Sequence, residues 1–295
     1  MKVLVTGREG QLARSLAERA KLHPSLTLVS VGRPQLDLEQ PETIVSTINA
    51  AAPDLVINAA AYTAVDAAED EPDRAFRING AAAGQVASAA RSVGAAVIQI
   101  STDYVFDGLS DSPYPEDAAT NPQSIYGSSK LEGEHSVREA NPDHAIVRTG
   151  WVYSPWGHNF VRTMMIAAET RDSVAVVADQ RGNPSSALDL ADGLLALARQ
   201  WPGAGGTDRT YHLAGTGEAS WADLANASFA ECARIKQRSA MVHGIAMADW
   251  PARAVRPRSS TLDCVRFEDE FGFRMPAWRV SLPAVVRRIA EERVR

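Results

Sequence analysis

Short apolar runs alternate with helical patterns from the start of the chain, and this alternation restricts the possible fold more than any other feature. Residues 2–6 and 27–31 are rich in β-branched and apolar side chains, and the segment between them repeats apolar residues at helical spacing. The same alternation predicts helices over 43–51, 75–93 and 125–139 and strands over 55–59, 95–101 and 144–149. Strands joined through helices form a parallel sheet, so we predict an α/β fold with a Rossmann-type doubly wound sheet.

The pattern weakens after Trp151. Helices are predicted over 159–170, 188–200 and from about residue 282, strands over 173–178 and 210–214, and a surface loop over 202–207. We predict a dinucleotide-binding domain over residues 1–153, with a return segment over 188–215. A smaller α/β substrate-binding lobe is expected at the C-terminus, built from residues 154–187 and 216–295.

Composition excludes several classes of protein. The net charge of −6 leaves no basic surface for a polyanion, so no nucleic-acid partner is expected. No run approaches the roughly 18 apolar residues of a membrane span, and the chain starts directly with a strand, so we expect a cytoplasmic protein that does not bind membranes. Cys232 and Cys264 lie far apart and the six histidines are scattered, so no disulfide framework or metal site is predicted.

The first strand leads into a glycine-containing turn of the form G-x-x-G-x-x-A. Gly7 permits a sharp turn, Gly10 allows the backbone to approach a pyrophosphate, and Ala13 lets the helix pack closely on the sheet. Backbone N–H groups at the start of the helix, at Gln11 and Leu12, would face the anion. The alternative is an ordinary tight turn, but its position directly after the first strand favours a dinucleotide site.

The end of the second strand is where such folds distinguish NADH from NADPH. Arg33 stands there in place of an acidic residue, and an arginine can pair with a 2′-phosphate. NADPH is therefore the predicted cofactor; NADH stays possible, because Arg33 could equally be a solvated loop residue. Asp37 and Leu38 are expected to flank the adenine. The small-residue segment that closes the third strand should also contact the cofactor: Ala59, Ala60, Ala61, Tyr62 and Thr63.

Tyr126 and Lys130 are four residues apart in a predicted helix and therefore share one face. A lysine ammonium beside a phenol stabilises the phenolate and lowers the phenol pKa, which predicts that Tyr126 exchanges a proton with a carbonyl or alcohol. Ser101 and Thr102 end a parallel strand at the edge where ligands bind. We expect Ser101 at the cofactor and Thr102 at the reacting oxygen.

The combined motifs resemble those of the extended short-chain dehydrogenase/reductase family, in particular its reductases of dTDP-linked 4-keto-6-deoxy sugars. The resemblance covers about the first 190 residues. It rests on residues 3–12, 58–66 with Glu69, 101–108, 113–114, 116–117, 126–127, 130–131, 133–134, 148–153, 159–160, 179–180, and Gly182 with Pro184.

That resemblance implies a dTDP-linked deoxysugar substrate. It implies that hydride from the nicotinamide reaches C4 of dTDP-4-dehydro-L-rhamnose, that Tyr126 is the acid, and that Lys130 tunes Tyr126 and holds the nicotinamide ribose. Some members form metal-bridged dimers through an acidic residue in the first helix; residues 13–16 lack one, so no metal is predicted, although a homodimer is possible. The substrate would contact Val65, Asp66, Thr102, Asp103, Tyr126 and Trp151.

Two other functions stay open. A nucleotide-sugar epimerase, a dehydratase or another 4-keto-6-deoxyhexose reductase would use the same fold. A non-catalytic NADP-binding subunit, resembling the regulatory β subunit of methionine adenosyltransferase, could keep both Tyr126 and Lys130.

Overall fold

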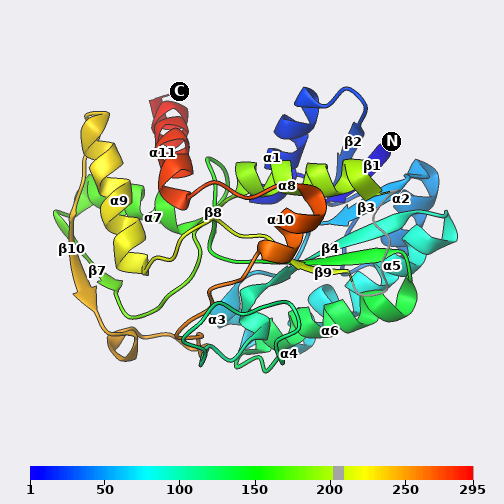
Figure 1. The fold of residues 1–295 in the computed structure, drawn as a ribbon, viewed down its shortest axis with the longest axis horizontal. Coiled ribbons are helices and arrows are strands. Elements are labelled where there is room, and N and C mark those ends of the chain that lie inside the picture. Colours follow the sequence, from blue (N-terminus) through cyan, green and yellow to red (C-terminus); the bar gives the residue numbers. More distant parts are fainter. Residues whose placement is uncertain (202–208, 295) are drawn as a thin grey trace.

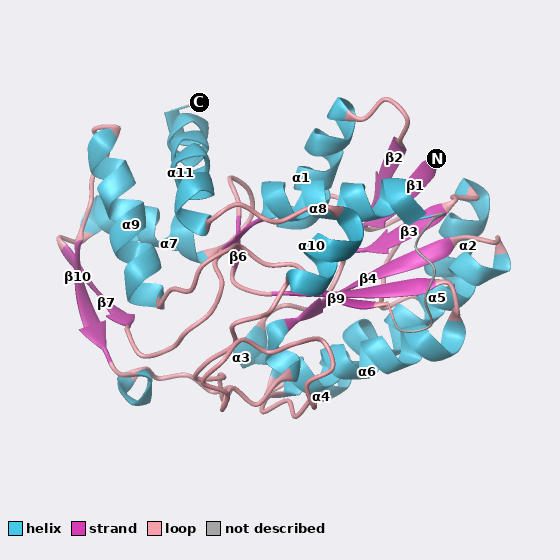
Figure 2. Cartoon of the chain, in the orientation of Figure 1, coloured by secondary structure: helices cyan, strands magenta, loops and turns pink. Residues whose placement is uncertain are grey.

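The computed structural model describes residues 1–201 and 209–294, and the predicted loop over 202–207 lies outside them. A six-stranded sheet and its covering helices form one side of the molecule, and a smaller group of helices and short strands lies beside it (Figure 1, Figure 2). The predicted α/β fold with a doubly wound parallel sheet is confirmed.

All neighbouring strands of the main sheet run parallel, in the order β2-β1-β3-β4-β5-β9. The chain passes from β1 outward to β2 and then returns to the other side of β1 for β3. The order therefore reverses between β1 and β3, which is where doubly wound sheets open a crevice for a ligand at the carboxyl ends of the strands. The strands are β1 (Lys2–Thr6), β2 (Thr27–Val31), β3 (Leu55–Asn58), β4 (Ala96–Thr102), β5 (His144–Thr149) and β9 (Thr210–His212).

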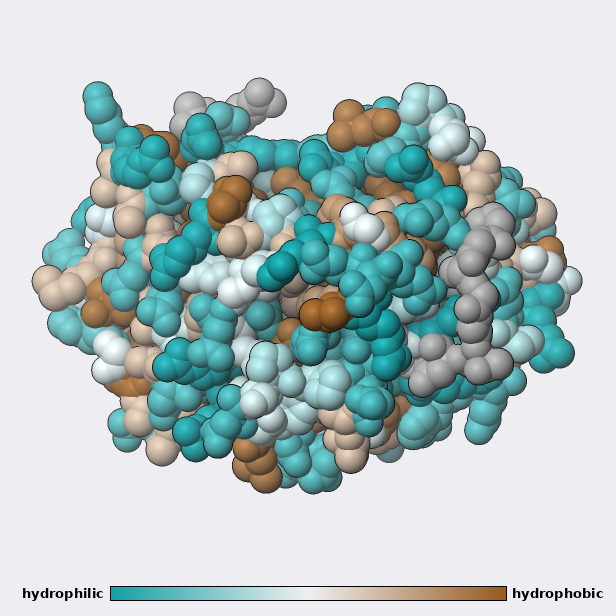
Figure 3. Space-filling model, viewed as in Figure 1, coloured by the Kyte–Doolittle hydropathy of each residue, from teal (hydrophilic) through white to brown (hydrophobic). Residues whose placement is uncertain are grey.

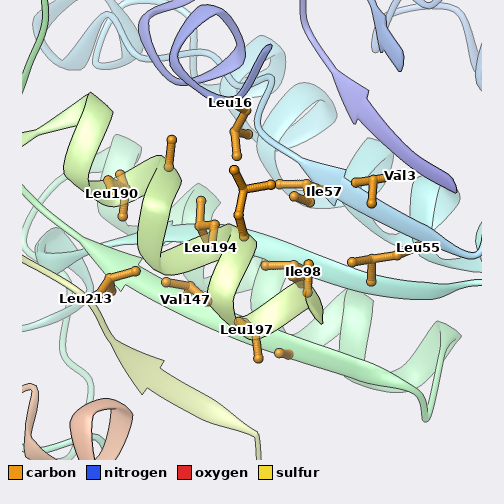
Figure 4. Close-up of a cluster of buried hydrophobic side chains, with 14 of the residues drawn as sticks. Val3, Leu16, Leu55, Ile57, Ile98, Val147, Leu190, Leu194, Leu197 and Leu213 are labelled. Atoms are coloured by element: carbon orange, nitrogen blue, oxygen red, sulfur yellow. The ribbon is translucent and has the colours of Figure 1, made fainter. Parts of the chain in front are cut away.

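Helices cover both faces of this sheet. One face packs against α1 (Gln11–Arg19), α8 (Ala187–Gln200) and α10 (Val265–Phe271), and the other against α2 (Pro41–Ala51), α5 (Ala82–Ser92) and α6 (Ile125–Ala140). In the first core, leucines of α1 and α8 lie against Val3, Ile57, Ile98 and other strand residues (Figure 4). Each such buried aliphatic side chain contributes about 1.5–3 kcal/mol, so this packing holds the carboxyl ends of the strands in place.

The remaining elements form two further hydrophobic cores beside the sheet, and α11 and α9 pack on each other there. Short parallel pairs link β10 with β7 and β6 with β8. These elements are β6 (Val152–Tyr153), α7 (Phe160–Thr170), β7 (Ser173–Val177), β8 (Ser185–Ser186), α9 (Trp221–Arg234), β10 (Met241–Ile245) and α11 (Trp278–Val294).

Several element boundaries differ from the predicted ones. The single helix predicted over 75–93 consists of α4 (Pro72–Ala75), the π-helical segment Phe76–Ala81 and α5, preceded by the short helix α3 (Val65–Ala68). The last helix begins at Trp278 rather than near residue 282, and Pro283 lies inside it rather than at its start. The sequence pattern also missed α9, although Ser220 and Asp223 form a capping box at its start.

The face of the molecule seen in Figure 3 is mostly hydrophilic, with hydrophobic residues scattered among polar ones. No helix within residues 1–201 and 209–294 is long and apolar enough to cross a membrane.

Prediction for the packing of α6. A methyl group added at Gly133 would collide with the carbonyl oxygen of Asn79 in the π-helical segment. Gly133→Ala should therefore lower the free energy of unfolding by about 1–3 kcal/mol, measured by urea denaturation. Gly10→Ala is the matched control, because nothing lies within 4 Å of the added methyl. A Gly133→Ala protein as stable as the Gly10→Ala control would contradict the close packing of these helices.

Candidate active site

The turn after β1 lies at the point where the strand order reverses. Gly7 has a φ of +93°, which a side chain would strain, and its backbone lies close to Ala60 and Ala13. Gly10 precedes the first turn of α1, and no atom lies within 4 Å of the position that its Cβ would take. The backbone here faces open space, and α1 points its N-terminal N–H groups into it, which suits a phosphate group.

A chain of buried polar side chains joins the strand ends at this edge. Thr6 Oγ1 donates to Asn58 Oδ1 at 2.6 Å, and Asn58 Nδ2 donates to Gln99 Oε1 at 2.7 Å. Thr6 Oγ1 also accepts a hydrogen bond from the N–H of Ala60 at 3.1 Å. These bonds satisfy the buried polar groups and fix the ends of β1, β3 and β4 relative to one another.

Gln11 provides a second sign that a ligand belongs in the crevice. Its Oε1 is buried and has no hydrogen-bond partner among the described residues. A Cβ at Gly157 would lie 3.2 Å from Gln11 Cγ, so the two segments meet closely. A buried amide oxygen without a partner costs stability unless a ligand or water supplies a donor, and the amides and hydroxyls of a dinucleotide are suitable donors.

The residues predicted to surround the adenosine end take different positions. Arg33 is exposed beyond β2 and has no hydrogen-bond or ion-pair partner in the described part of the chain, so its guanidinium is available to an anion. Asp37 accepts a hydrogen bond from the N–H of Glu39 at 3.1 Å, and so stabilises its own turn. Leu38 is buried in the core that α2 covers, so little of its side chain is free to contact an adenine.

The segment after β3 is held by Asn79, a residue that the sequence analysis missed. Asn79 Oδ1 accepts from the N–H of Tyr62 at 2.8 Å, and its Nδ2 donates to the carbonyl of Tyr62 at 3.0 Å. Ala59, Ala60 and Ala61 are half-buried, and Thr63 is exposed. Asn79 lies in the π-helical segment, and such segments often occur at functional sites; this irregularity is invisible to a search for helical periodicity.

Tyr126 and Thr102 are brought together by the close contact of α6 with the end of β4. Ser124 caps α6 by accepting from the N–H of Gly127 at 3.1 Å, and a Cβ at Gly127 would collide with the carbonyl oxygen of Tyr104. This contact places the Tyr126 phenol near enough to Thr102 for that hydroxyl to affect the Tyr126 pKa, and edge-to-face with the Tyr104 ring, with ring centroids 5.7 Å apart. The Tyr126 phenol and the Thr102 hydroxyl therefore lie together at the end of β4.

Lys130 is buried one helical turn after Tyr126, and its ammonium donates to the carbonyl of Ile100 in β4 at 2.6 Å. Burial lowers the pKa of Lys130 to about 8, an effect that the charge of Glu134 opposes. At neutral pH Lys130 is therefore still positively charged.

The structure does not show the expected low pKa of Tyr126. Burial raises the pKa of Tyr126 to about 12, helped by the nearby Asp103 and opposed by the hydrogen bond with Thr102. Desolvation of the phenolate outweighs any stabilisation by Lys130, whose ammonium is directed at the Ile100 carbonyl. The phenol is consequently protonated at neutral pH, ready to act as an acid.

Asp103 is fully buried directly beneath Thr102. Thr102 Oγ1 donates to Asp103 Oδ1 at 3.0 Å, whereas Asp103 Oδ2 has no hydrogen-bond partner among the described residues. Burial raises the pKa of Asp103 to about 6, and the nearby hydroxyls of Ser260 and Thr102 oppose the shift. Gly150 has no side chain, and the Asp103 carboxyl occupies the space that a Cβ there would take. Because Thr102 donates to it, the Asp103 carboxyl orients that hydroxyl.

Ser101 precedes Thr102 at the end of β4. It is buried, and its hydroxyl donates to Glu134 Oε1 at 2.6 Å. Adjacent residues of a strand point to opposite faces, so Thr102 faces the site while Ser101 points into the interior. Its hydroxyl is therefore bonded to α6, and a contact of Ser101 with the cofactor stays a prediction.

Trp151 has a φ of +50° and stacks on Trp221, with ring centroids 3.5 Å apart and planes 3° from parallel. A Cβ at Gly182 would collide with the same indole. Trp221 Nε1 donates to Gln180 Oε1 at 3.1 Å, which fixes the stack. One face of Trp151 is therefore covered by Trp221, a residue that the sequence analysis missed, and only the rest of the ring can face a sugar.

Asp66 joins the sheet side of the crevice to the C-terminal segment. Arg256 donates to both Asp66 oxygens, at 3.1 and 2.7 Å, and the N–H groups of Arg253 and Ala254 donate to Oδ1. The hydrogen bond with Arg256 lowers the pKa of Asp66. Val65 starts the same short helix and is half-buried. Arg256 also contacts Tyr104, so it reaches the edge of the site.

A cavity of about 350 Å³ beside α10, lined by residues such as Leu213, Cys264 and Arg274, contains none of the predicted site residues. Within residues 1–201 and 209–294 no group of three or more His, Cys, Asp or Glu side chains is placed to hold a metal ion.

Prediction for Asp103. Its pKa is higher in the folded chain than the ordinary value of 3.8, so the folded state binds the proton more tightly and its stability falls as pH rises through about 4 to 6. Asp103→Asn should remove this decline and be more stable than the parent at pH 7 by about 2 kcal/mol. Urea denaturation from pH 4 to 8 measures both curves; parallel curves for the parent and the variant would rule out the raised pKa.

Comparisons with known proteins agree with this geometry. A curated dTDP-4-dehydrorhamnose reductase of Sinorhizobium fredii is 45% identical over 288 residues, which cover 97% of each chain. Its counterpart in Escherichia coli is 36% identical over 98% of each chain.

Solved structures resemble the chain equally well. A dTDP-4-dehydrorhamnose reductase of Clostridium acetobutylicum superposes with a TM-score of 0.90 at 37% identity, covering 97% of this chain and 99% of the other. One from Bacillus anthracis, in complex with NADP, gives 0.88 at 34% identity and covers 96% and 98%. The family model of the RmlD substrate binding domain matches residues 1–291, and the chain belongs to this family.

Proposed function

We propose that the chain reduces the C4 keto group of dTDP-4-dehydro-L-rhamnose to give dTDP-L-rhamnose, with NADPH as the reductant. The observation that carries the proposal is the meeting of Tyr126 with Thr102 above the buried Lys130, at the edge of the sheet where the strand order reverses. The names of the relatives support the substrate, and the NADP complex of one relative supports the cofactor.

The residues around the crevice fit NADPH. The turn at Gly7 and Gly10 would hold the pyrophosphate against the start of α1, with Gln11 and Leu12 at its first turn and the unpaired Gln11 Oε1 facing the ligand. Arg33 would pair with the 2′-phosphate, and the half-buried segment 59–62 would line the path to the nicotinamide. When bound, NADPH supplies the hydride that reduces the sugar carbon.

Tyr126 acts as the acid in this reaction. Its phenol carries a proton at neutral pH and gives it to the C4 oxygen as that oxygen becomes an alkoxide. The charged Lys130, one turn away, then stabilises the phenolate that Tyr126 leaves behind, and a proton from solvent restores the phenol. Thr102 would turn its one hydroxyl proton from Asp103 to the reacting oxygen when the substrate binds, and so hold that oxygen at the phenol.

The remaining part of the chain would bind the rest of the substrate. We place the dinucleotide-binding domain at residues 1–153 with the return segment 188–215, and the substrate lobe at 154–187 and 216–295. Trp151, stacked on Trp221, and the Val65–Asp66 turn would contact the deoxysugar from the two sides. We expect the reaction to take place in the cytoplasm, where NADPH is available. A homodimer stays a prediction.

Two alternatives differ in chemistry. Epimerases and dehydratases share the fold: a UDP-glucose 4-epimerase of Brucella ovis superposes with a TM-score of 0.81 at 21% identity and covers 99% of this chain and 98% of its own. A dehydratase needs an acidic pair beside the catalytic position, whereas Thr102-Asp103-Tyr104 supplies one carboxylate. A regulatory subunit would keep the crevice and lack turnover.

The deciding experiment incubates the purified chain with NADPH and dTDP-4-dehydro-L-rhamnose and identifies the sugar formed. Stoichiometric consumption of NADPH with formation of dTDP-L-rhamnose supports the reductase. Interconversion of sugars without net oxidation of NADPH would indicate an epimerase. Binding of NADPH with no change in the sugar would indicate a non-catalytic subunit.

Prediction for the acid. Tyr126→Phe should lower kcat by about 10²- to 10⁴-fold and leave NADPH affinity nearly unchanged, because the proton donor is lost while the phosphate-binding turn is intact. Steady-state kinetics and NADPH fluorescence titration measure the two effects. Tyr114→Phe is the control, because Tyr114 donates its hydroxyl to Asp107 away from the crevice. Equal turnover in the Tyr126→Phe variant and the parent would reject the role of Tyr126.

Prediction for cofactor choice. Arg33→Ala should weaken NADPH binding about 10-fold or more while NADH binding changes little, because only NADPH carries the 2′-phosphate. Dissociation constants for both cofactors test this, with the exposed Arg171 changed to alanine as the control. If NADPH loses no affinity relative to NADH, Arg33 does not recognise the phosphate.

A further inference from the structure

A buried ion pair lies one helical turn beyond Lys130, and no step of the proposed reaction uses it. The Glu134 carboxylate of α6 accepts hydrogen bonds from Arg148 Nε and Nη2, both at 2.8 Å. It also accepts the bond from Ser101 Oγ at 2.6 Å. The side chain of Glu134 is 0% exposed and that of Arg148 4% exposed, so the pair is shielded from water. A fully bonded charge pair in the interior demands an explanation, because such pairs seldom add net stability.

The position of this pair suggests that it aligns the catalytic elements. α6 contacts two successive residues of β4: Lys130 donates to the carbonyl of Ile100, and Glu134 accepts from the hydroxyl of Ser101. Thr102 follows directly. Arg148 attaches β5 to the same carboxylate. The contacts therefore set how α6 lies along β4, which determines whether Tyr126 meets Thr102.

Glu134 also acts on the Lys130 ammonium through its charge. Burial favours the neutral amine, and the negative charge of Glu134 opposes that effect. Burial likewise disfavours the Glu134 carboxylate, but the hydrogen bonds and charge of Arg148, with the Ser101 hydroxyl and the Arg138 charge, outweigh it and leave the pKa of Glu134 below its ordinary value. Glu134 is therefore charged throughout the neutral range.

Other titratable groups surround α6, but among the described residues they do not shift the pKa of Lys130. Those on α6 and on the segments packed against it are Asp66, Asp73, Arg74, Arg77, Arg91, Asp103, Tyr104, Tyr126, Glu132, His135, Arg138, Glu139, His144 and Arg148. Within the described residues, Glu134 is the charged side chain that shifts the pKa of Lys130.

We propose that Glu134 is a positioning residue for the reduction: with Ser101 and Arg148 it holds α6 against β4 and β5, and it places a buried negative charge one helical turn from Lys130. The role in catalysis rests on the proposed reductase function. The effect of Glu134 on Lys130 can be measured without any substrate, so the Glu134 proposal and the proposed reductase function can fail separately.

The direct test is the titration of Lys130 by NMR in the full chain labelled with ¹³Cε-lysine. The sequence has four lysines, Lys2, Lys21, Lys130 and Lys236, and the Lys130→Arg variant identifies the signal. Glu134→Gln should lower the Lys130 titration midpoint by about one pH unit, the lower end of the effect of a nearby charge. Glu132→Gln, an exposed change of the same charge on the same helix, should leave it unchanged.

A Lys130 midpoint that is the same in the Glu134→Gln variant and the parent would overturn the proposal. If that variant fails to fold because Arg148 is left unpaired, the double variant Glu134→Gln, Arg148→Met decides, since replacing both partners of a buried pair is tolerated. It should show the same lowered midpoint, and an unshifted one would also overturn the proposal.

The kinetic arm tests the catalytic consequence. The fall of kcat/KM at alkaline pH, where Lys130 loses its proton, should begin about one pH unit earlier in Glu134→Gln than in the parent. The control Glu132→Gln should show the same pH profile as the parent. A merely structural role would lower kcat at every pH without shifting the alkaline fall of kcat/KM, and that result would contradict the proposal. A parent without reductase activity would reject the proposed function, and the NMR titration would still decide the action of Glu134 on Lys130.

Discussion

The hydrogen bond from the buried Lys130 ammonium to the Ile100 carbonyl is the contact on which the site depends. It joins the helix that carries Tyr126 to the strand that ends in Thr102, at a distance of 2.6 Å. An ammonium is costly to bury, and the bond, together with the charge of Glu134, keeps it protonated at neutral pH despite a pKa lowered to about 8. The Lys130 ammonium thus both joins α6 to β4 and provides a positive charge at the site.

The acid chemistry follows from this arrangement. Because burial raises the pKa of Tyr126 to about 12, the phenol holds its proton until an alkoxide forms beside it. Thr102 is held from below by the buried Asp103, and α6 is held by Glu134 and Arg148. The reacting groups are therefore placed before a ligand arrives, which is how enzymes reduce the cost of orienting reactants.

Local patterns were sufficient to predict the parallel sheet, the turn at Gly7 and Gly10, and the shared helical face of Tyr126 and Lys130. These features follow from alternation and from spacing of a few residues. The pKa of Tyr126 could not be predicted in this way, because burial depends on segments distant in the sequence. The same is true of Trp151, whose partner Trp221 lies 70 residues later, and of Asp66, which pairs with Arg256. The cofactor contact expected at Ser101 stays a prediction; its bond to Glu134 joins residues 33 positions apart, which local patterns cannot reveal.

A crystal structure of the chain with NADP⁺ and dTDP-L-rhamnose bound tests the central claim most directly. The claim predicts that C4 of the nicotinamide and the C4 hydroxyl of the sugar lie together beside the Tyr126 hydroxyl, with Thr102 bonded to the sugar oxygen and Lys130 at the nicotinamide ribose. A sugar bound elsewhere, or a nicotinamide turned away from Tyr126, would contradict it.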